Sequence, residues 1–149
     1  MRSALIPICA LLLVGCDDGD GNSTPDRTSP EAGDTYVAGL EKAGAASKIN
    51  VRLLEAHPAP PERGDNQWVL EVLDGEATPL AGCILVLDPD MPAHGHGTWK
   101  DAVVTEMDTP GHYSVDPVFM FMPGLWEIPI TLTCGEVSDT VLYAFWIEG

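Results

Sequence analysis

Apolar residues recur at every second position near the end of the chain, and this period constrains the fold more than any other feature. In the segment 126–134 one face carries Trp126, Ile128, Ile130, Leu132 and Cys134, and Glu, Pro and Thr fill the other. Side chains of a β-strand point alternately to its two faces, so this pattern predicts a strand with one buried face. The segment 140–147 repeats the period, but its second face is also nearly apolar, and we expect cover on both sides.

Five earlier stretches with strand character bring the expected number of strands to about seven. They are residues 49–54, 67–73, 83–87, 102–107 and 113–121. Clusters of turn-forming residues separate them, with the spacing typical of a β-sandwich. In the stretch 37–46, Ala and Gly dilute both helix and strand patterns, and we expect an irregular segment or a short strand. The sequence therefore predicts an all-β fold.

Two local features refine this prediction. Pro129 has no backbone N–H, so the strand 126–134 should have an edge or a bulge at that point. The run 108–113 resembles a tyrosine corner, in which the hydroxyl of Tyr113 would bond back to the preceding turn. This corner is typical of immunoglobulin-like domains, and we predict an immunoglobulin-like β-sandwich.

Residues 1–15 have the form of a signal peptide, with Arg2 ahead of an apolar stretch that ends at Val14. The stretch is too short to span a membrane, which takes about 20 helical residues. The motif Leu13-Val14-Gly15-Cys16 resembles the lipobox of bacterial lipoproteins, in which the cysteine is lipidated and the chain is cleaved before it. The alternative is an ordinary secretory signal with Cys16 at the junction.

The lipobox resemblance implies a protein of the bacterial cell envelope, held to a membrane by lipid on Cys16. Its domain would lie in the periplasm or outside the cell. Residues 16–34 are rich in Asp, Gly, Ser, Thr and Pro and lack an apolar period, so we predict a flexible acidic linker there. The domain would then occupy residues 35–149.

The chain carries a formal net charge of −16, and all of its acidic residues lie at or beyond Asp17. Such a charge repels phosphate backbones, so we expect no nucleic-acid partner. Metal cations and basic proteins are the partners that this charge favours. The identity of a protein partner is not encoded in any motif.

Cys83 and Cys134 remain once the leader and the lipidated cysteine are set aside, and both lie in predicted strands on the core face. In an oxidising compartment we expect them to form a disulfide between the two sheets. The loop-closure model gives such a bridge about 4 kcal/mol of stabilisation. The alternative is two free thiols that act as small core residues.

The run 90–97 places a thioether and two imidazoles within a glycine-rich loop, and two more methionines follow in 119–126. We predict a metal site formed by Met91, His94, His96 and Met122. Imidazole and thioether together suit copper, above all Cu(I), better than Ca²⁺ or Mg²⁺. Zinc has only Asp90, His94 and His96 as local ligands. The alternative is that the histidines cap a turn and that Met120 or Met122 fills the core.

At these residues the sequence resembles the YtkA-like and FixH-like families of exported bacterial domains. The shared features are Trp68, Met91-Pro92-x-His94-Gly95-His96-Gly97, Gly111-x-Tyr113 and Phe121-Met122-x-Gly124-x-Trp126, spread over residues 49–147. The resemblance implies an immunoglobulin-like sandwich without catalysis, and roles in metal handling or oxidase maturation for some members. FixH-type proteins usually carry a transmembrane anchor, which a lipid would replace here.

We do not expect an enzyme. His112, Ser114 and Asp116 share a face of one predicted strand by parity, which superficially fits an acyl-transfer triad. Side chains at such positions point in parallel, whereas a triad needs them to converge beside an oxyanion hole. The leading interpretation is a non-enzymatic lipoprotein that binds a soft metal, and the alternative is a structural or protein-interaction module without metal.

Overall fold

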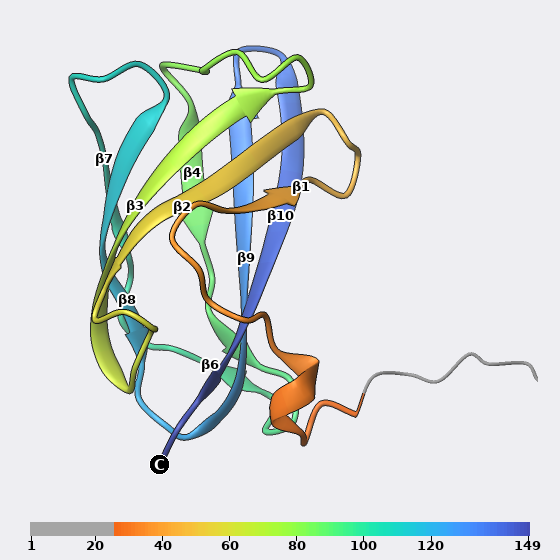
Figure 1. Cartoon of the computed structure of the whole chain (residues 1–149), viewed down its shortest axis with the longest axis vertical. Coiled ribbons are helices and arrows are strands. Elements are labelled where there is room, and N and C mark those ends of the chain that lie inside the picture. The colour runs from red at the N-terminus through yellow and green to blue at the C-terminus, as the bar shows by residue number, and fades with distance from the viewer. Residues whose placement is uncertain (1–25) are drawn as a thin grey trace, which may run out of the picture.

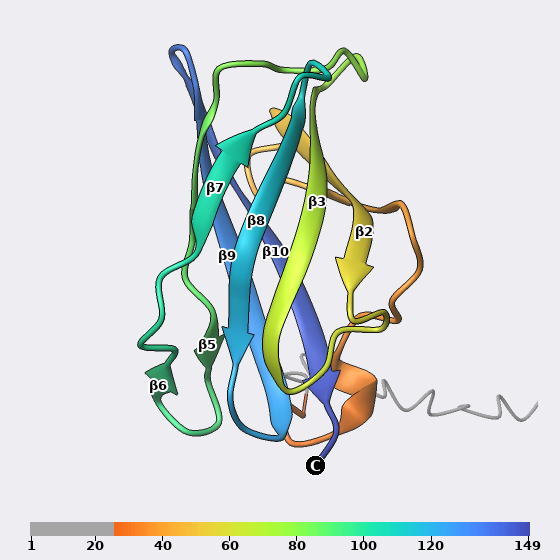
Figure 2. The same ribbon diagram turned by 90° about the vertical axis from the view of Figure 1, so that its left-hand side faces the viewer.

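The computed structural model describes residues 26–149, in which ten strands form two antiparallel sheets that face each other (Figures 1 and 2). The first sheet has the order β1-β2-β3-β8-β7, and the second has the order β10-β9-β5-β6, with β4 also paired to β9. The elements are η1 (Pro30–Ala32), β1 (Leu40–Ala43), β2 (Ile49–His57), β3 (Gly64–Asp74), β4 (Ile84–Leu87), β5 (Asp90–Met91), β6 (His96–Gly97), β7 (Val103–Glu106), β8 (His112–Met120), β9 (Gly124–Cys134) and β10 (Val137–Ile147).

The all-β prediction is confirmed. The seven strands expected from the sequence are β2, β3, β4, β7, β8, β9 and β10, and their order, β2-β3-β8-β7 against β10-β9-β4, is that of the two immunoglobulin sheets. The ambiguous stretch 37–46 supplies the short strand β1, and the Met/His loop supplies the two-residue strands β5 and β6.

The core lies between the sheets and is made by the alternation seen in the sequence. In β9 the even-numbered residues from Trp126 to Leu132 are fully buried. Trp68 of β3 contacts the edges of Tyr143 and Phe145 of β10, at ring-centroid distances of 6.0 and 5.7 Å. Complete burial of one large apolar side chain contributes about 1.5–3 kcal/mol, so this layer is the main source of stability.

Pro129 lies in the interior strand β9. In place of the predicted edge or bulge, the neighbouring strand is interrupted opposite this residue. On one side of β9 lies β10, and on the other side β4 and β5 follow each other with a gap between Leu87 and Asp90. The carbonyl of Pro129 accepts a bond from Asp88 N (3.2 Å) in this gap. Both backbone groups of a strand residue point to the same side, so the missing N–H also faces the gap. The proline therefore removes the one bond that its N–H would donate to Asp88 O across this gap, and it leaves the ladder between β9 and β10 intact.

Residues 26–34 belong to the segment predicted as a linker, and the end of this segment bonds to β10. The backbone N–H of Asp34 donates to Ala144 O (2.6 Å), and the Asp34 carboxylate accepts from Ala144 N (2.8 Å) and from Lys42. The edge of β10 offers unpaired backbone groups, and Asp34 satisfies those of Ala144. This segment provides part of the expected second cover of β10, but Leu142 remains 43% exposed.

The predicted tyrosine corner forms with a different partner. The Tyr113 hydroxyl donates to Leu80 O (2.9 Å) and accepts from Cys83 N (2.9 Å), so it fastens the loop before β4 and not the turn before β8. Burial raises the pKa of Tyr113, which keeps its proton available for Leu80.

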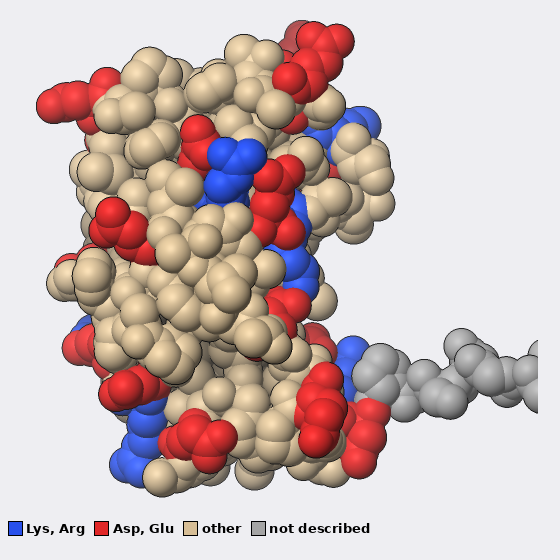
Figure 3. Space-filling model, in the orientation of Figure 1, with Lys and Arg blue, Asp and Glu red and all other residues tan. Residues whose placement is uncertain are grey.

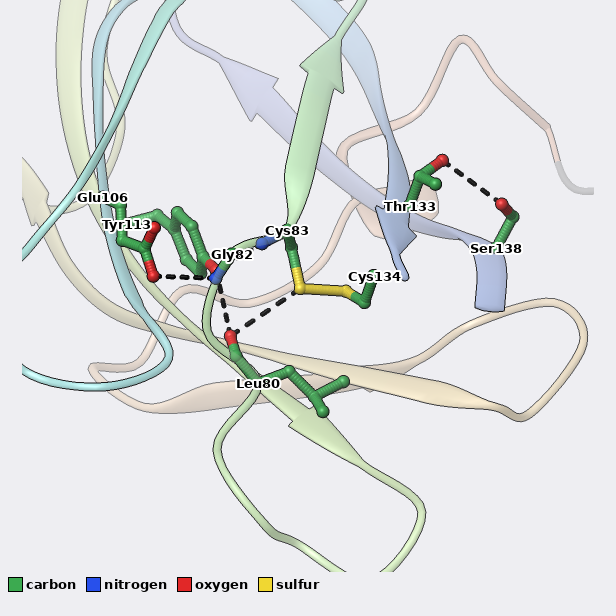
Figure 4. The surroundings of a disulfide bond; sticks show 8 residues. All are labelled: Leu80, Gly82, Cys83, Glu106, Tyr113, Thr133, Cys134 and Ser138. Carbon is green, nitrogen blue, oxygen red and sulfur yellow. Dashed lines mark hydrogen bonds between the residues drawn. A yellow bond between two sulfur atoms is a disulfide. The ribbon is translucent and has the colours of Figure 1, made fainter. Parts of the chain in front are cut away.

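Cys83 and Cys134 are joined by a disulfide, shown in Figure 4. The prediction of a bridge between the sheets is wrong, because Ile84 pairs with Thr133 and the two cysteines stand opposite each other at the end of one sheet. The disulfide fixes β4 to β9 where both strands approach the β9–β10 turn. This end of the sandwich lies opposite the end that carries the Met/His loop (Figure 2).

Candidate functional site

The Met/His run forms a small hairpin at the end of the sandwich where β8 turns into β9 (Figure 2). Met91 pairs with His96 across the hairpin, and Asp90 pairs with Glu127 of β9. Gly95 closes the hairpin with φ of +68°, a backbone conformation that side chains other than glycine rarely adopt. The glycine expected to allow a tight turn therefore does so, and it places both histidines beside the methionine.

Met91 is fully buried and marks the inner end of the site. A Cβ atom at Gly124 would come within 2.9 Å of the Met91 methyl carbon, so the thioether lies directly against the β8–β9 turn. His94 follows one turn later, with its backbone N bonded to Met91 O (2.9 Å) and its side chain exposed. The hairpin thus holds a buried thioether beneath an accessible imidazole.

Met91 and His94 line the same pocket, which has a volume of about 240 Å³. The other walls come from Ala93, from Pro123 to Leu125, from Trp146, and from Arg27 and Thr28 of the N-terminal segment. Arg27 is held there by an ion pair with Glu127 (3.3 Å). Apart from His94 and this segment, the pocket walls are apolar, so a ligand inside it lies among hydrocarbon, one imidazole, the buried Met91 side chain and the polar groups of Arg27 and Thr28.

His96 lies beside His94 but is held by a different group. The centroids of the two imidazole rings are 5.7 Å apart, and the His96 ring is nearly parallel to that of Phe121, at 5.6 Å. Two imidazoles bound to one metal ion, with metal–nitrogen bonds of about 2.0 Å, place their centroids roughly 5–6 Å apart. The spacing of His94 and His96 therefore allows both to bind one ion after rotation about their side-chain bonds.

Met122 is not among the residues that line this pocket. It is partly buried and packs against the core, and its carbonyl accepts a bond from the indole nitrogen of Trp126 (2.9 Å). Met120 is fully buried in the core. Of the four predicted ligands, His94 and His96 lie side by side and His94 shares a pocket with Met91. Met91 belongs to the buried core cluster, and Met122 packs against that cluster outside the pocket.

An aromatic cluster beside the hairpin was not singled out from the sequence. Trp99 contacts Phe121 and Phe119 at centroid distances of 4.3 and 5.2 Å, yet it is 71% exposed. Lys100 lies over Phe119 (5.2 Å) and bonds to both carboxylate oxygens of Asp65. A detectable signal is the spacing of Phe119 and Phe121, two residues apart where β8 ends at Met120, because such residues lie on the same side of an extended chain.

In the described part of the chain, carboxylate side chains do not join the two imidazoles of the hairpin in a metal-binding group. Within residues 26–149 there is no group of three or more His, Cys, Asp and Glu side chains placed to hold a metal ion. The two imidazoles of the hairpin are therefore not joined by a third side chain of these types in this part of the chain. Imidazole and thioether groups differ from the oxygen ligands that Ca²⁺ and Mg²⁺ prefer.

The residues considered for an acyl-transfer triad do not approach one another. His112 lies near Glu71 (3.7 Å), the Ser114 hydroxyl is directed at Thr105 O (3.4 Å), and Asp116 accepts from Gln67 (2.9 Å). Each of the three side chains is directed at a neighbouring strand and not at the next member of the set. This arrangement provides no nucleophile–base pair.

The fold and this end of the molecule define a class, the immunoglobulin-like β-sandwich with a Met/His hairpin at one end. The family model described as YtkA-like matches residues 45–131, which is more than half of the chain and includes the whole hairpin. The chain belongs to the YtkA-like family, and this part of the sequence resemblance is confirmed. The FixH-like part of it stays a prediction. No curated protein and no solved structure matched the chain.

The predictions on membrane attachment concern a part of the chain that the structure does not cover. The predicted signal peptide and Cys16 lie outside residues 26–149. Within the described range no helix is long and apolar enough to cross a membrane.

Proposed function

We propose that this protein is a non-enzymatic, lipid-anchored protein of the bacterial cell envelope that binds Cu(I) at the Met/His hairpin. The observation that carries the proposal is that Met91 and His94 line one largely apolar pocket. The signal peptide and the lipobox-like motif ending at Cys16 support the location, with the domain in the periplasm or outside the cell.

The chemistry of the donors selects the metal. Thioether sulfur is a soft ligand that favours Cu(I), and imidazole is compatible with copper. The apolar walls of the pocket keep water away from an ion, and this stabilises the lower oxidation state with its small coordination number. Met91 and His94 would supply ligands directly, and His96 would join after its ring leaves Phe121.

The surface charge is consistent with a cation as ligand. Figure 3 shows Asp and Glu side chains spread along the visible face, with Lys and Arg side chains lying among them. With a formal net charge of −16 the protein attracts cations and repels nucleic acids.

The test is competition for Cu(I) against a chromophoric chelator, using the mature chain with Cys16→Ser. We expect one Cu(I) per chain and loss of binding in the double variant His94→Ala with His96→Ala. Met91→Leu conserves volume and should weaken binding with little loss of stability, and Met122→Leu is the matched control that should not. Uptake by the double histidine variant at the level of the parent chain would refute the site.

A second readout is thermal unfolding. A metal that binds only the folded chain stabilises it by about 2.7 kcal/mol at a free concentration about 100 times its Kd, so Tm should rise with Cu(I).

The second candidate function is a protein-interaction module, and the exposure of Trp99 within the aromatic cluster favours it. In that case Cu(I) leaves Tm unchanged.

A further inference from the structure

The second sheet has two lateral edges, and hydrogen bonds from other segments of residues 26–149 protect the β10 edge but not the β4 edge. At the β10 edge, Asp34 bonds to the backbone N–H and C=O of Ala144, and Ala45 N donates to Thr140 O (2.9 Å). At the other edge β4 pairs with β9 alone. A strand edge with unpaired backbone groups is a template for another strand, and proteins normally block it.

The direction of the free groups on β4 follows from the ladder. Asp88 N donates to Pro129 O of β9, so alternate residues, Val86 and Ile84, also direct their backbone groups to β9. Leu85 and Leu87 consequently direct theirs away from the sheet. No residue of the described range 26–149 hydrogen-bonds to these groups. The next residue that directs its backbone away from β9 is Pro89, and its carbonyl accepts a bond from Thr98 N (3.0 Å). The unpaired backbone groups of this edge therefore end where the β5–β6 hairpin begins.

The side chains of β4 lack the usual means of blocking an edge. Ile84 and Val86 point outward and are 68% and 58% exposed. No charged residue occurs between Glu76 and Asp88, although the chain as a whole is strongly charged. By contrast, the edge strand β1 contains Glu41 and Lys42. An exposed apolar edge without charges is typical of a contact surface.

Charge decides between two occupants of this edge. Exposed acidic side chains mark both ends of the strip, because Glu106 accepts a bond from Gly82 N (2.8 Å) before β4 and Asp88 follows it. A second copy of the chain would bring the same acids and a formal charge of −16. A segment with basic residues at its ends meets complementary charge instead.

The geometry points to the β4 edge as a docking site for an extended segment of a partner protein, which pairs with Leu85 and Leu87 and carries Lys or Arg at its flanks. The segment adds a strand to the second sheet, and its outward side chains cover Ile84 and Val86. Because β4 has four residues, the added ladder is about 14 Å long and the affinity is modest. The inference does not depend on metal binding.

The test uses the metal-free mature chain with Cys16→Ser and a short peptide in which valine and threonine alternate between lysine-rich ends. We expect the amides of Leu85 and Leu87 to exchange with solvent roughly fivefold more slowly when the peptide is present in excess. The same peptide with glutamate-rich ends should have no effect.

Two lysine substitutions separate the edge from a general apolar effect. Val86→Lys places a like charge beside the peptide and should abolish the slower exchange. Leu142→Lys makes the same kind of change on the outer face of the same sheet, but at β10, and should preserve it. The inference is overturned by unchanged exchange at Leu85 and Leu87, by equal effects of both peptides, by binding to Val86→Lys, or by dimerisation without peptide in sedimentation velocity.

Discussion

The two ends of the sandwich differ in how their polar and reactive groups are satisfied. At one end the sulfur atoms of Cys83 and Cys134 bind each other, and the Tyr113 hydroxyl bonds to the backbone of the loop before β4. At the other end His94, His96 and Trp99 are exposed to solvent. The first end is closed by partners within the chain, and the second leaves two imidazoles and one indole exposed.

Asp139 lies near the closed end, at the start of β10, and its polar atoms are likewise satisfied by partners within the chain. Its carboxylate is buried and accepts bonds from the backbone N–H groups of Ala46, Lys48, Ile49 and Thr140. The β1–β2 turn is thereby fastened to β10. The difference between the ends implies that stability and binding can be altered separately, and the following changes test this separation.

Removal of the disulfide should have the largest effect. Cys83→Ala combined with Cys134→Ala should lower the free energy of unfolding by about 4 kcal/mol, because a constraint on the unfolded chain is lost. Urea unfolding measures this change, with the reduced parent chain as control. Cu(I) affinity of the folded variant should be unchanged, and a parallel loss of affinity would show that the two ends are coupled.

Loss of the Asp139 carboxylate should be nearly as costly. Asp139→Ala removes the acceptor of four backbone N–H groups, of which that of Ile49 is buried, and should lower the free energy of unfolding by about 3 kcal/mol. Glu136→Ala, at an exposed position in the preceding turn, is the control and should change little. If both variants unfold at the same urea concentration, the fastening of the β1–β2 turn contributes nothing.

The Tyr113 hydroxyl should contribute a smaller amount. Tyr113→Phe keeps the ring in the core and removes the bonds to Leu80 and Cys83, so we expect a loss of about 1–2 kcal/mol. Thermal unfolding checks this value. The Tyr36→Phe variant, which removes a single bond to Ala56 N, should lose less.

The Asp139 carboxyl should also make the free energy of unfolding depend on pH. Burial alone would raise its pKa, but the hydrogen bonds from four backbone N–H groups outweigh burial and lower the pKa below its ordinary value. Its contribution is therefore complete above the pKa of the unfolded chain and is lost as pH falls through the folded-state pKa. Urea midpoints measured from neutral pH to about pH 3 should fall less steeply in Asp139→Asn than in the parent chain.

The smallest effect on stability is expected at the open end. His94→Ala with His96→Ala should change the free energy of unfolding by less than about 0.5 kcal/mol, because both side chains are exposed. Calorimetry of the metal-free variant measures this. A loss of several kcal/mol would mean that these imidazoles serve the fold and would favour the interpretation without metal.

The sequence predicts the strands well because alternation reports burial directly, as the even-numbered residues of β9 show. It also selects the cysteines that pair. It does not reveal that they lie in one sheet, because spacing along the chain carries no information on which strands become neighbours. The partner of the Tyr113 hydroxyl is about thirty residues upstream and escapes prediction for the same reason.

The candidate site was predicted in part. The tight hairpin follows from Gly95, and the proximity of Met91 to both histidines follows from the hairpin. The position of Met122 depends on how β8 turns into β9, and packing decides this. Residues 26–34 have no apolar period, so their attachment through Asp34 to Ala144 leaves no pattern in the sequence.

That attachment has a mechanical consequence. Arg27 and Thr28 form part of the wall around Met91 and His94, and the Arg27–Glu127 ion pair holds them in place. Tension applied to the chain ahead of this segment would load the ion pair first and then peel the segment from β10. The pocket would lose one wall while both sheets stayed intact, so a pull on the N-terminal side would widen access to the sulfur without unfolding the domain.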